Sequence, residues 1–371
     1  IYADESIYEY PMQQGGGNDG RPYSFGRPSS GGSKAAYPCK SYGQGRINPA
    51  YFYGIFDPND MRRDVSITMT GSNGKGVEKL IPFVPNSKAE GGGLTLNKWD
   101  ENRQANPWVA AQRKSGINGP YMRMSEVYLG YAEVCAALGD VVTGKQYLKT
   151  VRERSFPQGL ADTDGFIASF GNDLVRAIIE ERGFEYAGEG DRRWTLIRSG
   201  YLPEDIKRIK DMTKAMMDGL ATKGYYEFEN GNIISAYIWT KLVDAKTIYG
   251  HRLTAQCPMD KVNDPVLYPG WRGQKDNWEE MGLNYGNSAP ATNLAIKGLF
   301  EIVSEEEAAS LESQGYAKVN WGIDLVDYRD EYDKYLFWDY DYVSAPIYLW
   351  PFTPNVMAAG GFTNGYGFKQ E

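Results

Sequence analysis

The stretch that decides the fold of this chain is Tyr121-Met-Arg-Met-Ser-Glu-Val-Tyr-Leu-Gly-Tyr-Ala-Glu-Val134. Apolar side chains recur in it at intervals of three and four residues, which is the spacing of one face of an α-helix. Pro120 stands at the expected first turn, and Gly139 stands where the helix should stop. The periodic positions are Met124, Val127, Tyr128, Tyr131, Val134, Cys135 and Leu138. This regularity predicts a helical core for the surrounding segment.

Three further helices are predicted in the next sixty residues. One runs over about 145–155, one follows Asn172 as its N-cap and continues to about residue 186, and one over about 192–198 closes on Gly200. Helices in such close succession favour antiparallel hairpins joined by short turns. We therefore take 116–200 as the helical core of the chain.

The segments on either side of this core have a different composition. Glycine (43) and proline (19) together make up about 17% of the 371 residues, against a usual ~12%, which favours turns and long loops. We expect a mainly α fold with extensive loops and a few short β-hairpins. Within a single unit spanning 1–371, we divide the chain into a loop-rich segment with short strands (1–115), the helical core (116–200) and a loop-rich C-terminal region (201–371).

Several elements outside the core are predicted from local patterns. Alternating polar and apolar residues predict strands over 5–10 and 65–70. Helical spacing predicts short helices over 294–300 and 305–314. The residues after Asp341 are rich in proline, glycine and aromatic side chains, so we expect an extended segment lying over the core.

Charge and hydropathy exclude several classes of protein. The chain has 40 basic and 48 acidic residues, and its net charge of −8 disfavours nucleic acid as a partner. No stretch approaches the ~20 apolar residues of a membrane-spanning helix, and the first residues do not resemble a signal peptide. We expect neither nucleic-acid binding nor a bilayer span.

Histidine and cysteine are too scarce for most metal and triad chemistry. His251 is the single histidine of the sequence, which removes histidine-based triads and most zinc sites. Cys39, Cys135 and Cys257 match no metal-binding spacing and allow at most one disulfide. The sequence therefore implies no cofactor and leaves the redox state of the thiols open.

The enzyme hypothesis that fits the many carboxylates best is a glycoside hydrolase. It needs two carboxyl groups on opposite sides of a sugar, about 5 to 9.5 Å apart. Glu181 and Glu185 are the obvious pair, but neighbours on one helix face point the same way. The stretch 162–165 carries two aspartates and a glycine as some calcium loops do, yet it lacks the later ligands, so structural calcium stays open. We find no catalytic site and predict a protein that is not an enzyme.

The aromatic content favours recognition. The chain has 28 Tyr, 14 Phe and 9 Trp residues. Tyrosine and tryptophan combine a flat apolar face with a polar tip, which suits stacking on sugar rings or contact with peptides. The competing interpretation is an aromatic core or a contact with a partner protein. The candidate ligand-binding residues lie in two long glycine-rich or proline-rich loops: Tyr23, Phe25, Tyr37, Tyr42, Trp271, Asn277 and Trp278.

Four motifs occur in a fixed order and match a known pattern. The stretch 121–134 is similar to Arg-x-x-Glu-x-Tyr-Leu-x-x-Ala-Glu. The motifs after it are Gly139-Asp140 with Val151-Arg-Glu-Arg154, then Glu181-Arg-Gly-Phe-Glu185 with Gly188-Glu-Gly190, then Arg193-Trp-Thr-Leu-Ile-Arg-Ser-Gly200. Degraded counterparts of a proline-framed tail stand at Tyr348-Leu-Trp-Pro351 and Asn364-Gly-Tyr366. In this order the motifs resemble those of the SusD/RagB family, closely over 116–200 and loosely elsewhere.

The resemblance implies a function at the surface of a bacterial cell. Members of this family are lipid-anchored on the extracellular face of the outer membrane. They bind an oligosaccharide, or a peptide in some branches, and cap a SusC-like TonB-dependent transporter as its lid. The resemblance thus implies glycan binding in polysaccharide utilisation, with membrane association only through a lipid anchor that this chain does not contain. A peptide-binding lid and a non-catalytic structural subunit of an outer-membrane complex remain the alternatives.

The family pattern also implies a longer protein. A lipid-accepting cysteine and several tetratricopeptide-like helices normally precede the segment that Glu5-Ser-Ile-Tyr-Glu-Tyr10 resembles. Either those helices form a piece outside this chain, which is the hypothesis we favour, or the protein is an unusually short relative. An intact mass of the source protein near 41.6 kDa would contradict the favoured hypothesis.

The charged motif residues are expected to hold the scaffold together. Arg123, Glu126 and Glu133 follow one helix flank, and Glu181 and Glu185 follow another. Such charges are most simply ion pairs or hydrogen bonds between packed helices. The motifs then identify the fold without marking the ligand site.

Overall fold

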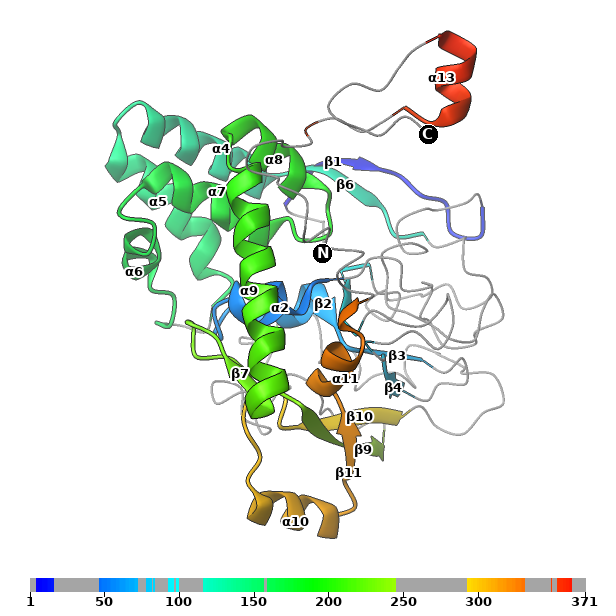
Figure 1. Ribbon diagram of the computed structural model, residues 1–371. Helices are drawn as coiled ribbons and strands as arrows, with labels where there is room; N and C mark the ends of the chain where they lie inside the picture. The colour runs from blue at the N-terminus through cyan, green and yellow to red at the C-terminus, as the bar shows by residue number, and fades with distance from the viewer. Residues whose placement is uncertain are drawn as a thin grey trace.

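The computed structural model describes residues 5–16, 47–72, 78–81, 83, 93–96, 98–99, 116–156, 159–244, 292–330, 348 and 352–361. In these residues the chain is mainly α-helical with short antiparallel strand pairs, which confirms the predicted fold class (Figure 1). The helices are α2 (Pro49–Gly54), α3 (Met61–Ser66), α4 (Met124–Ala137), α5 (Val141–Glu153), α6 (Thr163–Ala168), α7 (Leu174–Glu185), α8 (Asp191–Ser199), α9 (Leu202–Lys223), α10 (Glu305–Ser313), α11 (Gly322–Asp327) and α13 (Pro354–Gly360).

The strands form five small antiparallel sheets. They are β1 (Ser6–Tyr10), β2 (Ile67–Thr68), β3 (Thr70–Ser72), β4 (Glu78–Leu80), β5 (Thr95–Leu96), β6 (Gly119–Arg123), β7 (Tyr225–Glu227), β8 (Ile233–Ser235), β9 (Tyr237–Asp244), β10 (Thr292–Lys297) and β11 (Ala317–Asn320). Four are pairs, namely β1–β6, β2–β5, β3–β4 and β7–β8, and the fifth has the order β10-β9-β11. No sheet among the described residues exceeds three strands, so the helices dominate the core.

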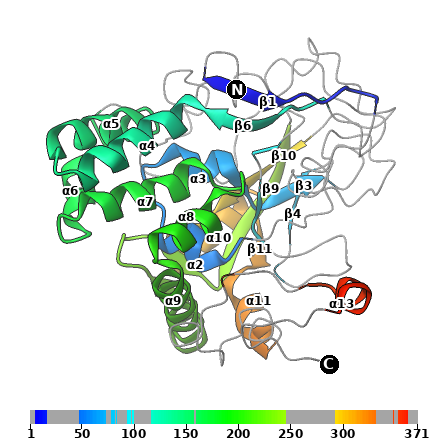
Figure 2. The ribbon, with the colours of Figure 1, turned by 90° about the horizontal axis from the view of Figure 1, so that it is seen from above.

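Helices α4, α5 and α7 pack around one apolar cluster on one flank of the molecule (Figure 2). Leu129 of α4, Leu148 of α5 and Ile178 of α7 are completely buried there. Gly144 lies where α5 approaches α4, and a Cβ at this position would stand 3.0 Å from the carbonyl oxygen of Ala132. The close approach of the two helices therefore depends on a residue without a side chain.

A second cluster lies between α2, α9, α11 and the sheet β10-β9-β11. Phe52, Met216 and Ile238 are completely buried in it. Its polar atoms are paired: the Trp321 indole N–H donates to Tyr53 Oη at 2.9 Å, and the Tyr53 hydroxyl donates to the Leu299 carbonyl oxygen at 3.0 Å. Figure 1 shows α9 running between the two regions, so this long helix joins the helical flank to the sheet.

The predicted start of the main helix is wrong. Pro120 belongs to β6, where it lies opposite Glu9 of β1, and α4 begins only at Met124. Arg123 keeps extended backbone angles (φ −126°, ψ 158°), and the Met124 N–H donates to the Glu5 carbonyl oxygen at 2.8 Å. The residues before Met124, which the position of Pro120 predicted to be the first helical turn, are therefore a strand paired with β1.

Other local expectations are partly confirmed. Strand β1, helix α10 and the end of α8 at Gly200 are confirmed, whereas the N-cap of α7 is Asp173 and not Asn172. The predicted strand over 65–70 is wrong at its start, because α3 continues to Ser66. The predicted helix over 294–300 is also wrong, because residues 292–297 form β10. A short buried apolar run in the sequence does not distinguish a strand from a helix. The expected extended tail contains helix α13.

Two further observations bear on the earlier expectations. Cys135 is buried with a free thiol, and Cys39 and Cys257 lie outside the described residues. Within the described part of the chain, no helix has the length and apolar character needed to cross a bilayer.

Candidate functional site

The motif carboxylate Glu181 lies at the centre of a buried charge network. Its two oxygens accept hydrogen bonds from Arg62 Nη1 at 2.6 Å and from Arg152 Nη1 at 3.0 Å. Glu181 is completely buried, and its partners come from α3 and α5. One carboxylate on α7 therefore joins three helices.

Glu185, one turn further along α7, extends this network to β6. It pairs with Arg62 at 3.1 Å and with Arg123 at 2.9 Å, and it also contacts Arg154. Arg123 in turn donates two hydrogen bonds to Glu189, at 3.0 and 2.9 Å. Burial alone would raise the pKa of Glu185, but the surrounding cations hold that pKa well below its usual range. Glu185 is thus a charged anchor at neutral pH.

Glu180 forms a separate cluster on the other side of α7. Its carboxylate accepts hydrogen bonds from Arg192 Nη2 at 2.8 Å and from Arg208 Nη2 at 2.6 Å. Both arginines also bind Asp205 of α9. Burial would raise the pKa of Glu180, but Arg192 and Arg208 outweigh it and lower the pKa to about 2. This cluster joins α7, α8 and α9.

These contacts confirm that the motif charges hold helices together. Both oxygens of Glu181 and of Glu185 are taken up by arginines, so neither carboxylate faces an open cleft. Glu133 of α4 is paired as well, with Arg198 at 2.7 Å. The arrangement does not place the pair Glu181 and Glu185 on two sides of a substrate, as hydrolysis of a glycosidic bond requires.

The aspartates of the sequence stretch 162–165 serve a helix. Asp162 is the N-cap of α6, and its side chain accepts from the Gly165 N–H at 2.8 Å. Asp164 pairs with Lys145. Nowhere in the described ranges do three or more His, Cys, Asp or Glu side chains gather around a common point where a metal ion could be held.

The structure reveals an exposed apolar face, and four of its residues are periodic positions of the predicted helix that the sequence did not predict to be exposed. Tyr8 of β1 and Tyr121 of β6 are 59% and 73% exposed, and their rings meet edge to face at 5.7 Å. The face continues along α4 and the start of α5, with exposed side chains at Val127, Tyr131, Val134, Leu138, Val141 and Val142. Helix α4 is therefore apolar on two opposite sides, a pattern typical of helices that pack between neighbours. Of the seven periodic positions named from the sequence, only Cys135 is buried, Met124 and Tyr128 are half-buried, and the other four are exposed. The buried side of α4 is instead formed by Ser125, Leu129, Ala132 and Cys135.

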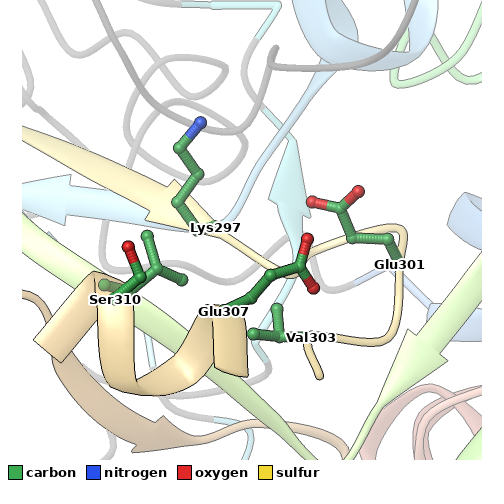
Figure 3. A pocket seen from close by; sticks show the side chains of 6 residues that line it. Lys297, Glu301, Val303, Glu307 and Ser310 are labelled. Atoms are coloured by element: carbon green, nitrogen blue, oxygen red, sulfur yellow. The ribbon is translucent and has the colours of Figure 1, made fainter. Parts of the chain in front are cut away.

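A small polar hollow of about 200 Å³ lies beside α10 (Figure 3). Lys297, Glu301 and Glu307 line it, and Figure 3 shows the carboxylates of the two glutamates on the same side of the hollow. Glu307 is held in a capping box: its carboxylate accepts from the Ser304 backbone N–H at 3.0 Å. These hydrogen bonds lower the pKa of Glu307, which makes it a poor general acid.

A larger groove of about 370 Å³ lies at the C-terminal end of α9, against β7. Tyr225 and Tyr226 of β7 form one wall, and Asp218, Thr222 and Lys223 of α9 form the other. Aromatic rings, carboxylates and an ammonium group together can contact the faces and hydroxyls of a polar ligand. The signal for this groove in the sequence is slight: two adjacent tyrosines after a helix-ending Gly224.

The predicted ligand-binding residues lie outside the described residues. Tyr23, Phe25, Tyr37 and Tyr42 fall within 17–46, and Trp271, Asn277 and Trp278 fall within 245–291. Their role as a binding surface stays a prediction. The described residues supply the scaffold, the exposed apolar face and the two polar hollows.

The fold and the charge networks place the chain in a class of mainly α-helical proteins. In it, the charged motif residues are buried and hold neighbouring helices together. The particular family follows from comparison with known proteins: a model of the SusD family matches residues 2–352, and the chain belongs to this family. The match covers nearly the whole sequence, including both predicted ligand-binding loops.

Individual relatives overlap the chain only in part. The SusD-like protein P25 of Formosa agariphila is 28% identical over 160 residues, which are 43% of this chain and 26% of that protein. The chain thus spans about a quarter of the length of this curated relative. A SusD homologue from Bacteroides thetaiotaomicron is 23% identical, with a TM-score of 0.31 over 44% of this chain and 33% of its own. A SusD superfamily protein from Bacteroides fragilis is 20% identical, with a TM-score of 0.34 over 52% and 40%.

Proposed function

We propose that this protein binds glycans at the cell surface and passes them to a SusC-like TonB-dependent transporter as its lid subunit. Membership of the SusD family over residues 2–352 is the observation that carries the proposal. Carbohydrate binding and polysaccharide utilisation fit this family. The proposed location is the extracellular face of the outer membrane, with attachment through a lipid anchor.

The structure supports a role in binding more than one in catalysis. The motif carboxylates are occupied by arginines, and the capped Glu307 is held in its charged form. Tyrosines and tryptophans are abundant in the loops that carry the predicted ligand contacts. Binding without catalysis needs only such aromatic surfaces on a rigid scaffold, which the buried charge networks provide.

The proposal is tested by calorimetry of the lipid-free protein against soluble polysaccharides, oligosaccharides and peptides. We expect saturable binding of at least one glycan, with no shortened products detected by mass spectrometry. Binding of peptides alone would favour the peptide-binding alternative. The appearance of shortened products would overturn the assignment as a protein that is not an enzyme.

The predicted loop residues are tested in the same experiment. Replacing Trp271 and Trp278 by alanine removes two aromatic surfaces from one loop, so we expect substantially weaker glycan binding. Unchanged affinity in both variants would remove that loop from the site. Tyr23 and Tyr42 allow the same test of the first loop.

A further inference from the structure

The groove between α9 and β7 has a fixed shape. Helix α9 ends at Gly224, whose left-handed backbone (φ +76°) turns the chain directly into β7. Figure 1 shows β7 alongside the lower end of α9. Gly219 of α9 allows the two elements to touch, because a Cβ there would stand 2.6 Å from the Tyr226 ring and 3.2 Å from the Tyr225 carbonyl oxygen. Glycine at position 219 therefore lets α9 and β7 pack directly against each other beside the groove.

Both walls are anchored from behind. The Tyr226 ring packs edge to face on Phe228 at 4.8 Å, and Phe228 is buried in the second apolar cluster. On the other wall, Asp218 accepts a hydrogen bond from Arg329 at 2.7 Å. Because these side chains are already held in place, little conformational entropy is lost when a ligand binds in the groove.

Some of the polar side chains that line the groove are available to a ligand, whereas Asp218 is paired with Arg329 and the Thr222 hydroxyl donates to the Asp218 carbonyl oxygen at 2.8 Å. Among the described residues, neither the Tyr225 nor the Tyr226 hydroxyl has a hydrogen-bond partner, and the Lys223 ammonium and the Glu227 carboxylate have none either. The groove thus offers donors and acceptors together with two aromatic rings. That combination matches a ligand with many hydroxyls and apolar ring faces.

The charge of the groove narrows the ligand class. Asp218 and Glu227 are acidic and Lys223 is basic, so the lining carries no positive excess. A sulfated or uronate-rich glycan would meet two carboxylates and a single ammonium group, so the lining disfavours added negative charge. The volume of about 370 Å³ lies at the lower end of the ~300–1,000 Å³ range of ligand sites, which suits one or two sugar rings.

We propose that the groove between α9 and β7 is a binding subsite for a neutral oligosaccharide, separate from the loop residues of the predicted ligand site. The inference rests on the proposed function, because it assumes that glycans are the ligands of the whole protein. It adds a second contact with the same polymer on the described scaffold. Two subsites on one chain would raise the avidity for long glycans over short ones.

The test follows the reactivity of Lys223 during glycan binding. The full chain is treated with an amine-acylating reagent, with and without neutral hexose oligosaccharides of the malto, cello and manno series, and labelling is read by mass spectrometry. Lys214, which is exposed on the same helix, is the internal control. We expect a glycan that binds by calorimetry to lower the labelling rate of Lys223 at least threefold and to leave Lys214 unchanged.

Variants separate the groove from the rest of the protein. Tyr225→Ala should abolish the protection of Lys223 and weaken binding of that glycan about tenfold, as expected for an aromatic anchor. Tyr10→Ala removes a tyrosine that is 64% exposed on β1, which lies at the opposite end of the molecule from β7 (Figure 1), and it should change neither. Thermal midpoints of both variants are measured first, so that a folding defect is recognised.

The outcomes distinguish the inference from the proposed function. If a glycan binds but Lys223 is acylated at the same rate as without glycan, the groove is not a binding subsite, and the proposed function still stands. If no glycan binds at all, both are contradicted. Equal protection of Lys223 by sulfated or hexuronate oligomers would overturn the assignment of a neutral ligand.

Discussion

The charge network around α7 and the groove at the end of α9 use the same types of side chain in opposite ways. Glu181 and Glu185 are at most 5% exposed, and each carboxylate is shared between arginines from different elements. In the groove, the side chains of Lys223 and Tyr225 are accessible, and neither the ammonium group nor the hydroxyl has a hydrogen-bond partner among the described residues. The side chains that form the family motifs are therefore those that hold the scaffold together. A surface that faces a ligand can lack any sequence motif.

The largest effect is expected from breaking the network at its centre. Replacing Glu181 by leucine leaves Arg62 and Arg152 buried without their shared carboxylate. Removing one partner of a buried ion pair costs about 3–5 kcal/mol of unfolding free energy. Chemical denaturation followed by circular dichroism measures the loss.

An exposed ion pair gives the matched control. Asp211 pairs with Lys207 on α9, and both side chains are more than 60% exposed. Asp211→Asn should change the unfolding free energy by less than about 0.5 kcal/mol. A Glu181→Leu protein as stable as this control would show that the network does not hold the helices together.

A slightly smaller effect is expected in the apolar core of the same helices. Leu148 of α5 is completely buried between α4 and α7, so Leu148→Ala should cost about 2–5 kcal/mol. Val142 lies on the same helix but is 79% exposed, and Val142→Ala should cost less than about 0.5 kcal/mol. Equal losses in the two variants would mean that the stack does not pack as described.

The buried carboxylates also predict how stability depends on pH. The folded pKa of Glu180 is about 2, against 4.5 for an unperturbed glutamate, and the pKa of Glu185 is lowered as well. A lowered folded pKa contributes stability that is complete above the unfolded pKa and is lost as the pH falls toward the folded pKa. For Glu180 alone this amounts to roughly 3 kcal/mol.

This dependence is measured from denaturation midpoints between pH 7 and pH 2. We expect a plateau above about pH 5.5 and a steep loss between about pH 4.5 and pH 2. A Glu180→Gln variant should start from a lower plateau and lose less over that interval. If the unfolding free energy of the wild-type protein is constant down to pH 3, the buried ion pairs do not contribute to stability as proposed.

The helical core could be predicted from sequence because its signals are local. Apolar spacing and the closing Gly200 specify α5, α7 and α8 within a few residues. The spacing of charges along the helix flanks predicted that Glu181 and Glu185 would be ion-paired, but not that Arg62 of α3 would be a partner. That contact joins residues 119 positions apart, and no local pattern encodes it.

Where the prediction failed, a distant segment decided the structure. Pro120 is in a strand because β1, more than one hundred residues earlier, pairs with 119–123. Residues 292–297 are a strand because β9 lies beside them. The large apolar side chains of α4 lie mainly on its exposed side, whereas its buried side carries Ser125, Leu129, Ala132 and Cys135. Side-chain size and periodicity therefore pointed to the wrong side of this helix. The groove at α9 went unnoticed because its residues are ordinary surface types.

The smallest predicted effect concerns the two sides of α4. In the described structure nothing lies within 4 Å of a Cβ added at Gly130, which stands in the middle of that helix. Glycine is less favourable than alanine in a helix by about 1 kcal/mol, so Gly130→Ala should raise the unfolding free energy by about that amount. At Gly144 of α5 the added Cβ meets Ala132 and Leu174 at 3.0 and 3.1 Å, so Gly144→Ala should lower it.

The sign of the Gly130 effect tells whether the outer face of α4 is open. A gain in stability in the 371-residue chain means that the exposed apolar stripe has no close neighbour there. A loss means that another segment packs against Gly130, because the added methyl group can only clash with a neighbour that is close. The change in unfolding free energy is then measured for Gly130→Ala and Gly144→Ala in the longest form of the protein that its source produces. A reversal of sign at Gly130 with no change at Gly144 would then show that additional residues cover this face.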